Sequence, residues 1–273
     1  MRHVRDREVL AGAAAPVFPA ICLGVLAMVA SGVSPVIWGQ QIAAWVIFSL
    51  LVLLLRRAAG RLSAWIWCAL LLGVLAASLA GQSVGGAKRW VDLVVFHANA
   101  AQLVLPAMLV ALSRVSCPYP MIMGAAVVLS RQPDFSQLMA FAAAASVILY
   151  RRAGEKMWKA GSVLVVVVCM VRCLMIPVEI EPVSYCEGIL SMLAGRSSLL
   201  WLAGWVALAL IPANWMHRYM GRKETFALGL AVYYAATMLF VLSGKYPVPF
   251  MGFGLSPIAG YAFACALCDA DER

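Results

Sequence analysis

Charged residues are scarce in this chain, since Asp, Glu, Lys and Arg together make up 12% of its 273 residues. Apolar types make up 64%, and the mean hydropathy is +0.92. A soluble domain of this length builds its core with far fewer apolar residues. The composition therefore excludes an ordinary soluble domain and indicates a polytopic membrane protein.

Histidine is scarce as well, with three residues, and no His-Glu or Ser-His pattern surrounds His97. The eight cysteines include Cys169 and Cys173, four positions apart, and Cys265 and Cys268, which form a C-x-x-C pair. Either spacing places two thiols on one face of a helix. The two pairs lie at different depths of the expected bundle, however, and cannot close one tetrahedral metal site. We interpret them as buried apolar thiols.

Where charged residues and histidines are scarce, the chain has long apolar runs. A membrane-spanning helix needs about 17–25 residues, and in lipid only helices and closed barrels satisfy their own backbone. The charged residues 1–8 precede a first run long enough to stay in the membrane as an anchor. The segment 116–130 is short and starts with Pro118 and Pro120, so a partly re-entrant course stays open for it. We predict an all-α bundle of about ten transmembrane helices, one integral membrane domain over residues 1–273, with spans at 10–30, 37–55, 63–80, 97–113, 116–130, 135–150, 160–177, 197–215, 225–243 and 251–268.

The basic residues predict how this bundle is oriented. With the N-terminus inside, fifteen of the 21 Lys and Arg fall in cytoplasmic segments. Positive residues favour that side, so we expect both termini in the cytoplasm. The formal net charge of +9 is then mainly a topology signal. Binding of nucleic acid is a poor alternative, because the basic residues are spread over short loops that suit an anionic inner leaflet.

One segment on the expected outer side breaks this charge rule. Gly85-Gly86-Ala87-Lys88-Arg89-Trp90-Val91-Asp92 carries two cations where few are expected. These outer charges could form only a solvated loop surface, with ion pairs worth about 0–1 kcal/mol each. Asp134 and Arg172, however, lie at span ends, where polar groups are costly and usually functional. The other charged residues on this side are Arg131, Glu179, Glu181, Glu187, Arg196 and Lys245.

Four segments, in order along the chain, carry motifs. They are Gly86-Ala87-Lys88-Arg89-Trp90-Val91-Asp92; Gln132-Pro133-Asp134-Phe135; Arg172 followed by Glu181-Pro182 and Ser184-Tyr185; and Pro247-Val248-Pro249-Phe250-Met251-Gly252-Phe253-Gly254. They resemble the motifs G-A-[RK]-R-W-[IV], Q-P-D-[LF], Arg…Asp-Pro…Gly-Tyr and P-L-P-F-[VI]-S-Y-G of the SEDS family (shape, elongation, division and sporulation; the FtsW/RodA/SpoVE type). The resemblance covers nearly the whole chain.

The chain also departs from the family pattern. Where the family has Q-P-S-E-L-x-K entering the fourth span, the chain reads Asn99-Ala100-Ala101-Gln102-Leu103, with Leu105 at the lysine position, so neutral groups replace a Glu–Lys pair. Ser136-Gln137 replaces G-T, and Gly252-Phe253-Gly254-Leu255-Ser256-Pro257 replaces S-Y-G-G-S-S. The long outer segment with an acidic H-T-D-F-I-F stretch, expected after Ala194-Gly195-Arg196, is absent. We interpret the chain as a shortened, divergent member.

The resemblance implies an activity and a location. The activity is that of a peptidoglycan glycosyltransferase, which polymerises undecaprenyl-pyrophosphate-linked disaccharide (lipid II) at the outer face of the bacterial cytoplasmic membrane. The process served is cell-wall synthesis, cell division or the maintenance of cell shape. A membrane-anchored transpeptidase of the class B penicillin-binding type is the expected partner.

The same resemblance assigns roles to residues. Glu181 is the candidate catalytic base, because a carboxylate within about 3 Å of the attacking hydroxyl could accept its proton, and Glu179 is its near alternative. The candidate pyrophosphate contacts are Lys88, Arg89, Arg172 and Arg196, since Arg can bind two phosphate oxygens at once. Asp92 and Asp134 would orient those cations or help to hold a divalent Mg or Mn ion. The remaining motif positions are Trp90, Gln132, Pro133, Tyr185, Pro247, Pro249 and Phe250.

Two alternatives stay open. The missing outer segment and the lost Glu–Lys pair favour a non-catalytic SEDS-like scaffold, or a binder or flippase of the lipid-linked precursor. A secondary transporter would need ionisable residues near the bilayer midplane and paired broken helices. The expected spans are almost free of midplane charge, which argues against a transporter.

Overall fold

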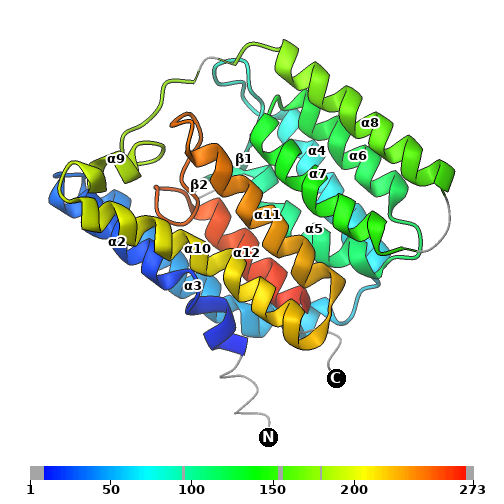
Figure 1. Cartoon of the computed structure of the whole chain (residues 1–273), viewed down its shortest axis with the longest axis horizontal. Coiled ribbons are helices and arrows are strands. Elements are labelled where there is room, and N and C mark those ends of the chain that lie inside the picture. The colour runs from blue at the N-terminus through cyan, green and yellow to red at the C-terminus, as the bar shows by residue number, and fades with distance from the viewer. Residues whose placement is uncertain (1–8, 94–95, 153–155, 179, 269–273) are drawn as a thin grey trace, which may run out of the picture.

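The computed structural model describes residues 9–93, 96–152, 156–178 and 180–268, and in this part the chain is mostly helical (Figure 1). Residues 9–14 are helical and lead into the first labelled helix. The helices are α2 (Phe18–Ala30), α3 (Pro35–Ala59), α4 (Ala64–Ala77), α5 (Ala100–Arg114), α6 (Tyr119–Arg131), α7 (Phe135–Tyr150), α8 (Lys156–Met175), α9 (Ile189–Ala194), α10 (Ser198–Arg222), α11 (Thr225–Val241) and α12 (Leu255–Cys268). A 3₁₀ turn, η1 (Ser78–Ala80), extends α4.

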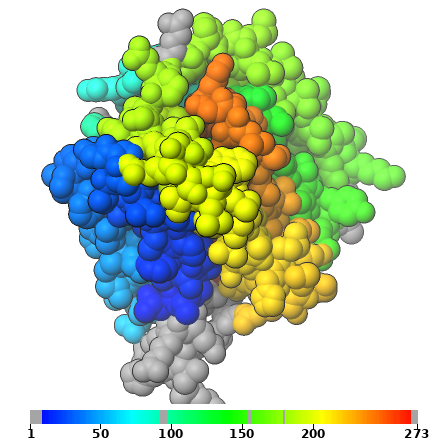
Figure 2. Space-filling model, turned by 60° about the vertical axis from the view of Figure 1, so that its left-hand side comes forward, coloured from blue at the N-terminus to red at the C-terminus, as the bar shows by residue number. Residues whose placement is uncertain are grey.

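The centre of the bundle is the pair α5 and α12, whose residues are mostly buried. Helix α12 packs against both α5 and α3, while α11 packs against α7 and α10. Gly260 makes the central crossing possible, because a Cβ at this position would lie 2.1 Å from the Gln102 carbonyl oxygen. Figure 2 shows α2, α10 and α11 lying side by side over one outer face.

The exterior of the bundle is apolar, as a lipid environment requires. Helices α3, α8 and α10 are long and apolar enough to cross a membrane by length and composition. Only 22%, 22% and 28% of their most apolar stretches are buried inside the protein. Shorter apolar helices, among them α5, α7, α11 and α12, fill the interior. The predicted all-α polytopic membrane fold is thus confirmed.

Both described ends of the chain lie at the same end of the bundle (Figure 1). The Tyr261 hydroxyl on α12 donates a hydrogen bond to the Gly12 carbonyl at 3.3 Å. The Trp45 indole on α3 likewise donates to the Ala14 carbonyl at 3.2 Å. This arrangement agrees with the expectation that both termini face one side of the membrane.

The loops at the opposite end contain structure that the sequence pattern did not predict. The expected span 97–113 begins only at Ala100, because residues before it form a hairpin of β1 (Trp90–Leu93) and β2 (Phe96–Asn99). The Asn99 side chain accepts a hydrogen bond from the Gln102 amide at 3.2 Å and so fixes the start of α5. The short helix α9 was not predicted, and α10 continues to Arg222, beyond the expected end at residue 215.

The prolines in segment 116–130 start a helix instead of interrupting one. Pro118 is the N-cap of α6, and Pro120 lies in its first turn, where proline is tolerated. Helix α6 then continues without a break to Arg131 and packs beside α8.

Candidate functional site

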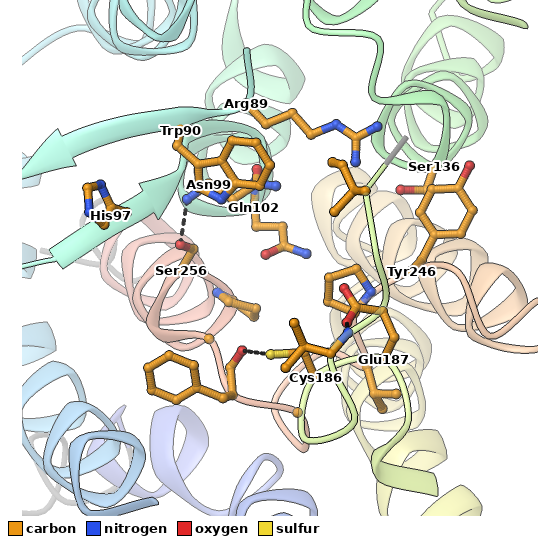
Figure 3. A pocket seen from close by; sticks show the side chains of 18 of the residues that line it. Arg89, Trp90, His97, Asn99, Gln102, Ser136, Cys186, Glu187, Tyr246 and Ser256 are labelled. Carbon is orange, nitrogen blue, oxygen red and sulfur yellow. Dashed lines mark hydrogen bonds between the residues drawn. The ribbon is translucent and has the colours of Figure 1, made fainter. Parts of the chain in front are cut away.

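A cavity of about 500 Å³ opens at the hairpin end of the bundle (Figure 3). The described residues that line it come from five parts of the chain: Gln40 on α3, the β1–β2 hairpin with the start of α5, the start of α7, the segment 180–187, and the segment 245–257. Among the residues with candidate roles, Arg89, Asp134 and Glu181 all contribute to its wall. These three residues are distant in sequence, so the fold brings them together as the motifs predicted.

Arg89 and Asp134 form an ion pair at the edge of this cavity. Arg89 Nε lies 3.6 Å from Asp134 Oδ2, and the two side chains are 12% and 2% exposed. Arg89 Nη2 also donates a hydrogen bond to the Pro133 carbonyl at 2.6 Å. Two separate contacts therefore fix the guanidinium group.

Asp134 has a second role as the N-cap of α7. Its Oδ1 accepts hydrogen bonds from the Ser136 hydroxyl at 3.0 Å and the Gln137 amide at 3.3 Å. Asp at this position satisfies amides that have no partner within the helix. The neighbouring Gln132 donates from Nε2 to the Leu75 carbonyl at 2.9 Å and to Ser78 Oγ at 2.6 Å. The Q-P-D motif thus ties α7, α6 and α4 together beside the cavity.

The segment that carries Glu181 is docked on the segment that follows α11. The Val248 amide donates to the Cys186 carbonyl at 3.2 Å, and the Phe253 amide donates to the Tyr185 carbonyl at 2.9 Å. The Tyr185 and Phe253 rings meet edge to face with centroids 6.3 Å apart. Gly252 allows the close approach, since a Cβ there would lie 2.3 Å from the Cys186 carbonyl oxygen.

Two glutamates of this segment line the cavity. Glu181 is exposed, whereas Glu187 is half-buried. Glu187 Oε2 accepts a hydrogen bond from the Val183 amide at 2.8 Å. Glu179, the alternative base, lies outside the described residues.

The other predicted cations do not line the cavity. Lys88 is exposed and donates to the Leu79 carbonyl at 3.3 Å. Arg172 donates to the Ser130 carbonyl near the end of α6. Arg196 is exposed and donates to the Ala30 carbonyl at the end of α2. Arg172 is thus not among the residues that line the cavity, and the pyrophosphate assignments of Lys88, Arg172 and Arg196 stay predictions.

Some of the remaining motif positions line the cavity, and others are buried nearby. Trp90 and Pro247 line the cavity, and Pro249 is buried behind it. Phe250 has a φ of +65°, a left-handed conformation that is uncommon for a residue with a side chain. Asp92 is paired with His97 in the hairpin register, and its side chain lies outside the described part.

The described residues do not bring together a set of metal ligands for a divalent cation. No three His, Cys, Asp or Glu side chains come together there as a metal cluster. Asp134, the described candidate, is already occupied by Arg89 and by the start of α7. We derive no step through a metal ion, and its participation stays a prediction.

Several cavity residues were not selected from the sequence. Glu187, Lys245 and His97 all line the cavity, although the sequence pattern assigns none of them a role. Tyr246 also lines it; burial raises its pKa, the Asp134 carboxylate adds to this, and Arg89 opposes it. Burial raises the pKa of the Cys186 thiol to about 12, helped by the charge of Glu187. Only the tertiary packing of the β1–β2 hairpin, segment 180–187 and segment 245–257 around one cavity could have identified these residues.

The fold and the cavity together define a class: a helical membrane protein of polytopic type with a polar site at one end of its bundle. No protein-family model and no curated protein matches the chain. Solved structures do match it. The rod shape determining protein RodA of Thermus thermophilus, as a point mutant, superposes with a TM-score of 0.62 at 18% identity, over 94% of this chain and 95% of RodA.

Two further structures give the same result. RodA of Thermus thermophilus without that substitution has a TM-score of 0.59 at 18% identity, over 94% of each chain. A chain from a structure of a peptidoglycan synthase complex, concerned with the coordination of polymerization and crosslinking, has a TM-score of 0.58 at 17% identity, over 96% of this chain and 98% of that one. The chain therefore has a SEDS-like fold, at low sequence identity.

Proposed function

We propose that this protein polymerises an undecaprenyl-pyrophosphate-linked disaccharide at the outer face of the bacterial cytoplasmic membrane. The observation that carries this proposal is the cavity in which Arg89, Asp134 and Glu181 meet. It lies at the end of the bundle opposite both described chain ends (Figure 1). With those ends in the cytoplasm, the cavity faces outward.

The cavity supplies groups that such a transfer needs. The acceptor's 4-hydroxyl must attack the donor's anomeric carbon while a lipid pyrophosphate leaves. A carboxylate near that hydroxyl can take its proton, and the wall contains the carboxylates of Glu181 and Glu187. Arg89, fixed by Asp134 and the Pro133 carbonyl, can face the negative charge that grows on the pyrophosphate. The apolar outer surfaces of α3, α8 and α10 suit the lipid tail.

The test is polymerisation of lipid-linked disaccharide by the purified protein, with and without a membrane-anchored transpeptidase of the class B penicillin-binding type. The proposed partner is consistent with the matched chain from a peptidoglycan synthase complex. We expect glycan chains from the wild type and none from Glu181→Gln. The substitution keeps volume and hydrogen-bonding reach but removes the negative charge of a carboxylate that lines the cavity.

A second candidate is a non-catalytic scaffold or precursor binder. The observation that favours it is the small number of cations in the cavity: of the four predicted pyrophosphate contacts, only Arg89 is in the wall, and it is already paired with Asp134. Measurable binding of lipid-linked precursor by a wild type that never polymerises it would establish this second candidate.

A further inference from the structure

The two glutamates in the segment 180–187 differ in how they are held. Glu181 is exposed, and in the described part of the chain it makes no hydrogen bond or ion pair. Glu187 is half-buried, and its Oε2 accepts the Val183 amide hydrogen at 2.8 Å. Both line the cavity. Glu187 is therefore the pre-positioned carboxylate of the two.

The backbone that carries Glu187 is fixed as well. Its neighbour Cys186 accepts a hydrogen bond from the Val248 amide at 3.2 Å, and the Cys186 thiol donates to the Phe253 carbonyl at 3.3 Å. Figure 3 shows Glu187 on the opposite side of the cavity from Arg89. A ligand between them would have a fixed cation on one side and a fixed carboxylate on the other.

Among the described residues three carboxylates line the cavity, and Glu187 is the one suited to proton transfer. Asp134 is committed to Arg89 and to the cap of α7. Glu181 would have to be ordered by the substrate before it could act. Glu187 has one oxygen on the Val183 amide, and in the described structure no hydrogen bond engages the other. A group that is already positioned needs no reorganisation at the moment of reaction.

We infer that Glu187 is a second catalytic carboxylate of this site and the general base for the acceptor sugar. This inference rests on the proposed glycosyl transfer. The acceptor hydroxyl oxygen forms a bond to the donor's anomeric carbon, and its proton passes to the free Glu187 oxygen. The bond from that carbon to the pyrophosphate breaks, and the electron pair leaves with the lipid pyrophosphate. Glu181, at the mouth, contacts the sugar without taking the proton.

The test compares Glu187→Gln with Glu181→Gln and with Ser184→Ala, a control in the same loop that does not line the cavity. Gln at position 187 can still accept the Val183 amide hydrogen, so the loop stays anchored while the base is lost. We expect the turnover number of Glu187→Gln to fall by about 10²–10⁴-fold with little change in KM. If Glu187 is the base, wild-type activity should fall on the acidic side of its pH profile, and the residual activity of Glu187→Gln should lack that fall.

The outcomes separate this inference from the proposed function. An active wild type whose Glu187→Gln variant keeps its activity and its pH profile overturns the role of Glu187 alone. A loss of activity that is matched by a lower unfolding temperature, with an unchanged pH profile, also overturns it, because Glu187 would then be only an anchor. A wild type that makes no glycan with any partner overturns both proposals together.

Discussion

Gln41 on α3 holds the backbone of Phe250, which lies 209 positions further along the chain. Its Nε2 donates to the Phe250 carbonyl at 2.7 Å and to the Met251 carbonyl at 3.3 Å. Phe250 has a φ of +65°, and Gln41 is fully buried. The hydrogen bonds of one side chain thus stabilise an uncommon conformation directly behind the candidate site.

Replacement of Gln41 by Leu should destabilise the protein by about 1–3 kcal/mol, because two buried carbonyl groups lose their donor. Thermal unfolding in detergent, followed by intrinsic fluorescence, measures the change. Gln82→Ala, in an exposed loop, is the matched control and should leave the unfolding temperature unchanged. Equal stability of the two variants would show that Gln41 does not hold the Phe250 turn.

Asp134→Ala should cost more than Asp134→Asn. Alanine leaves the Arg89 guanidinium without its counter-charge and also removes the cap of α7, whereas Asn keeps the cap. Loss of a cap costs roughly 1 kcal/mol, and loss of one partner of a buried pair costs roughly 3–5 kcal/mol. Unfolding temperatures of the two variants should therefore separate the two contributions. Identical temperatures would contradict the capping role.

Gly252→Ala should reduce activity because its Cβ would meet the Cys186 carbonyl oxygen at 2.3 Å and displace the segment that carries Glu181 and Glu187. Gly39→Ala is the control, since its Cβ would meet nothing within 4 Å. Polymerisation assays on both variants give the comparison. If Gly252→Ala stayed as active as Gly39→Ala, the docking of the two loops would not matter for the reaction.

Cys186 should react slowly with thiol reagents at neutral pH. Its pKa of about 12 keeps it protonated, and only the thiolate is nucleophilic. At pH 8 we expect alkylation to be roughly a thousandfold slower than that of a thiol near pKa 9, and to accelerate as the pH rises toward 12. Peptide-resolved mass spectrometry of iodoacetamide labelling provides the rates. A Ser184→Cys variant, exposed in the same loop, should react at the ordinary rate.

The membrane orientation can be checked with single cysteines in intact cells. Cysteine at Lys88, near the cavity, should react with a membrane-impermeant maleimide, whereas cysteine at Arg222, at the far end of α10, should react only after lysis. Both positions are exposed, so access depends on the side of the membrane. Labelling of both positions in intact cells would refute the predicted topology.

The helices could be predicted from the sequence because long apolar runs allow little else in lipid. The β1–β2 hairpin could not, since Trp90, Val91 and the apolar residues before Asn99 resemble the beginning of a span. Of the site, the motifs indicated Arg89, Asp134 and Glu181, which all line one cavity, while their roles stay predictions. Local pattern did not reveal that Arg172 and Arg196 bond to carbonyls elsewhere, because such contacts depend on tertiary packing.

Three helices begin at the cavity. Their N-termini contribute to the electrostatic potential there, in addition to the charged side chains. Helix α5 starts at Ala100, α7 at Phe135 and α12 at Leu255, and the cavity wall includes residues in or beside the first turn of each. A helix N-terminus behaves like about half a positive charge. At α7 the Asp134 carboxylate caps the helix and offsets its dipole. The N-termini of α5 and α12 add positive potential to the cavity, so part of the attraction for a phosphate group there comes from the backbone. Charge-reversing substitutions on the loops would then weaken anion binding only in part.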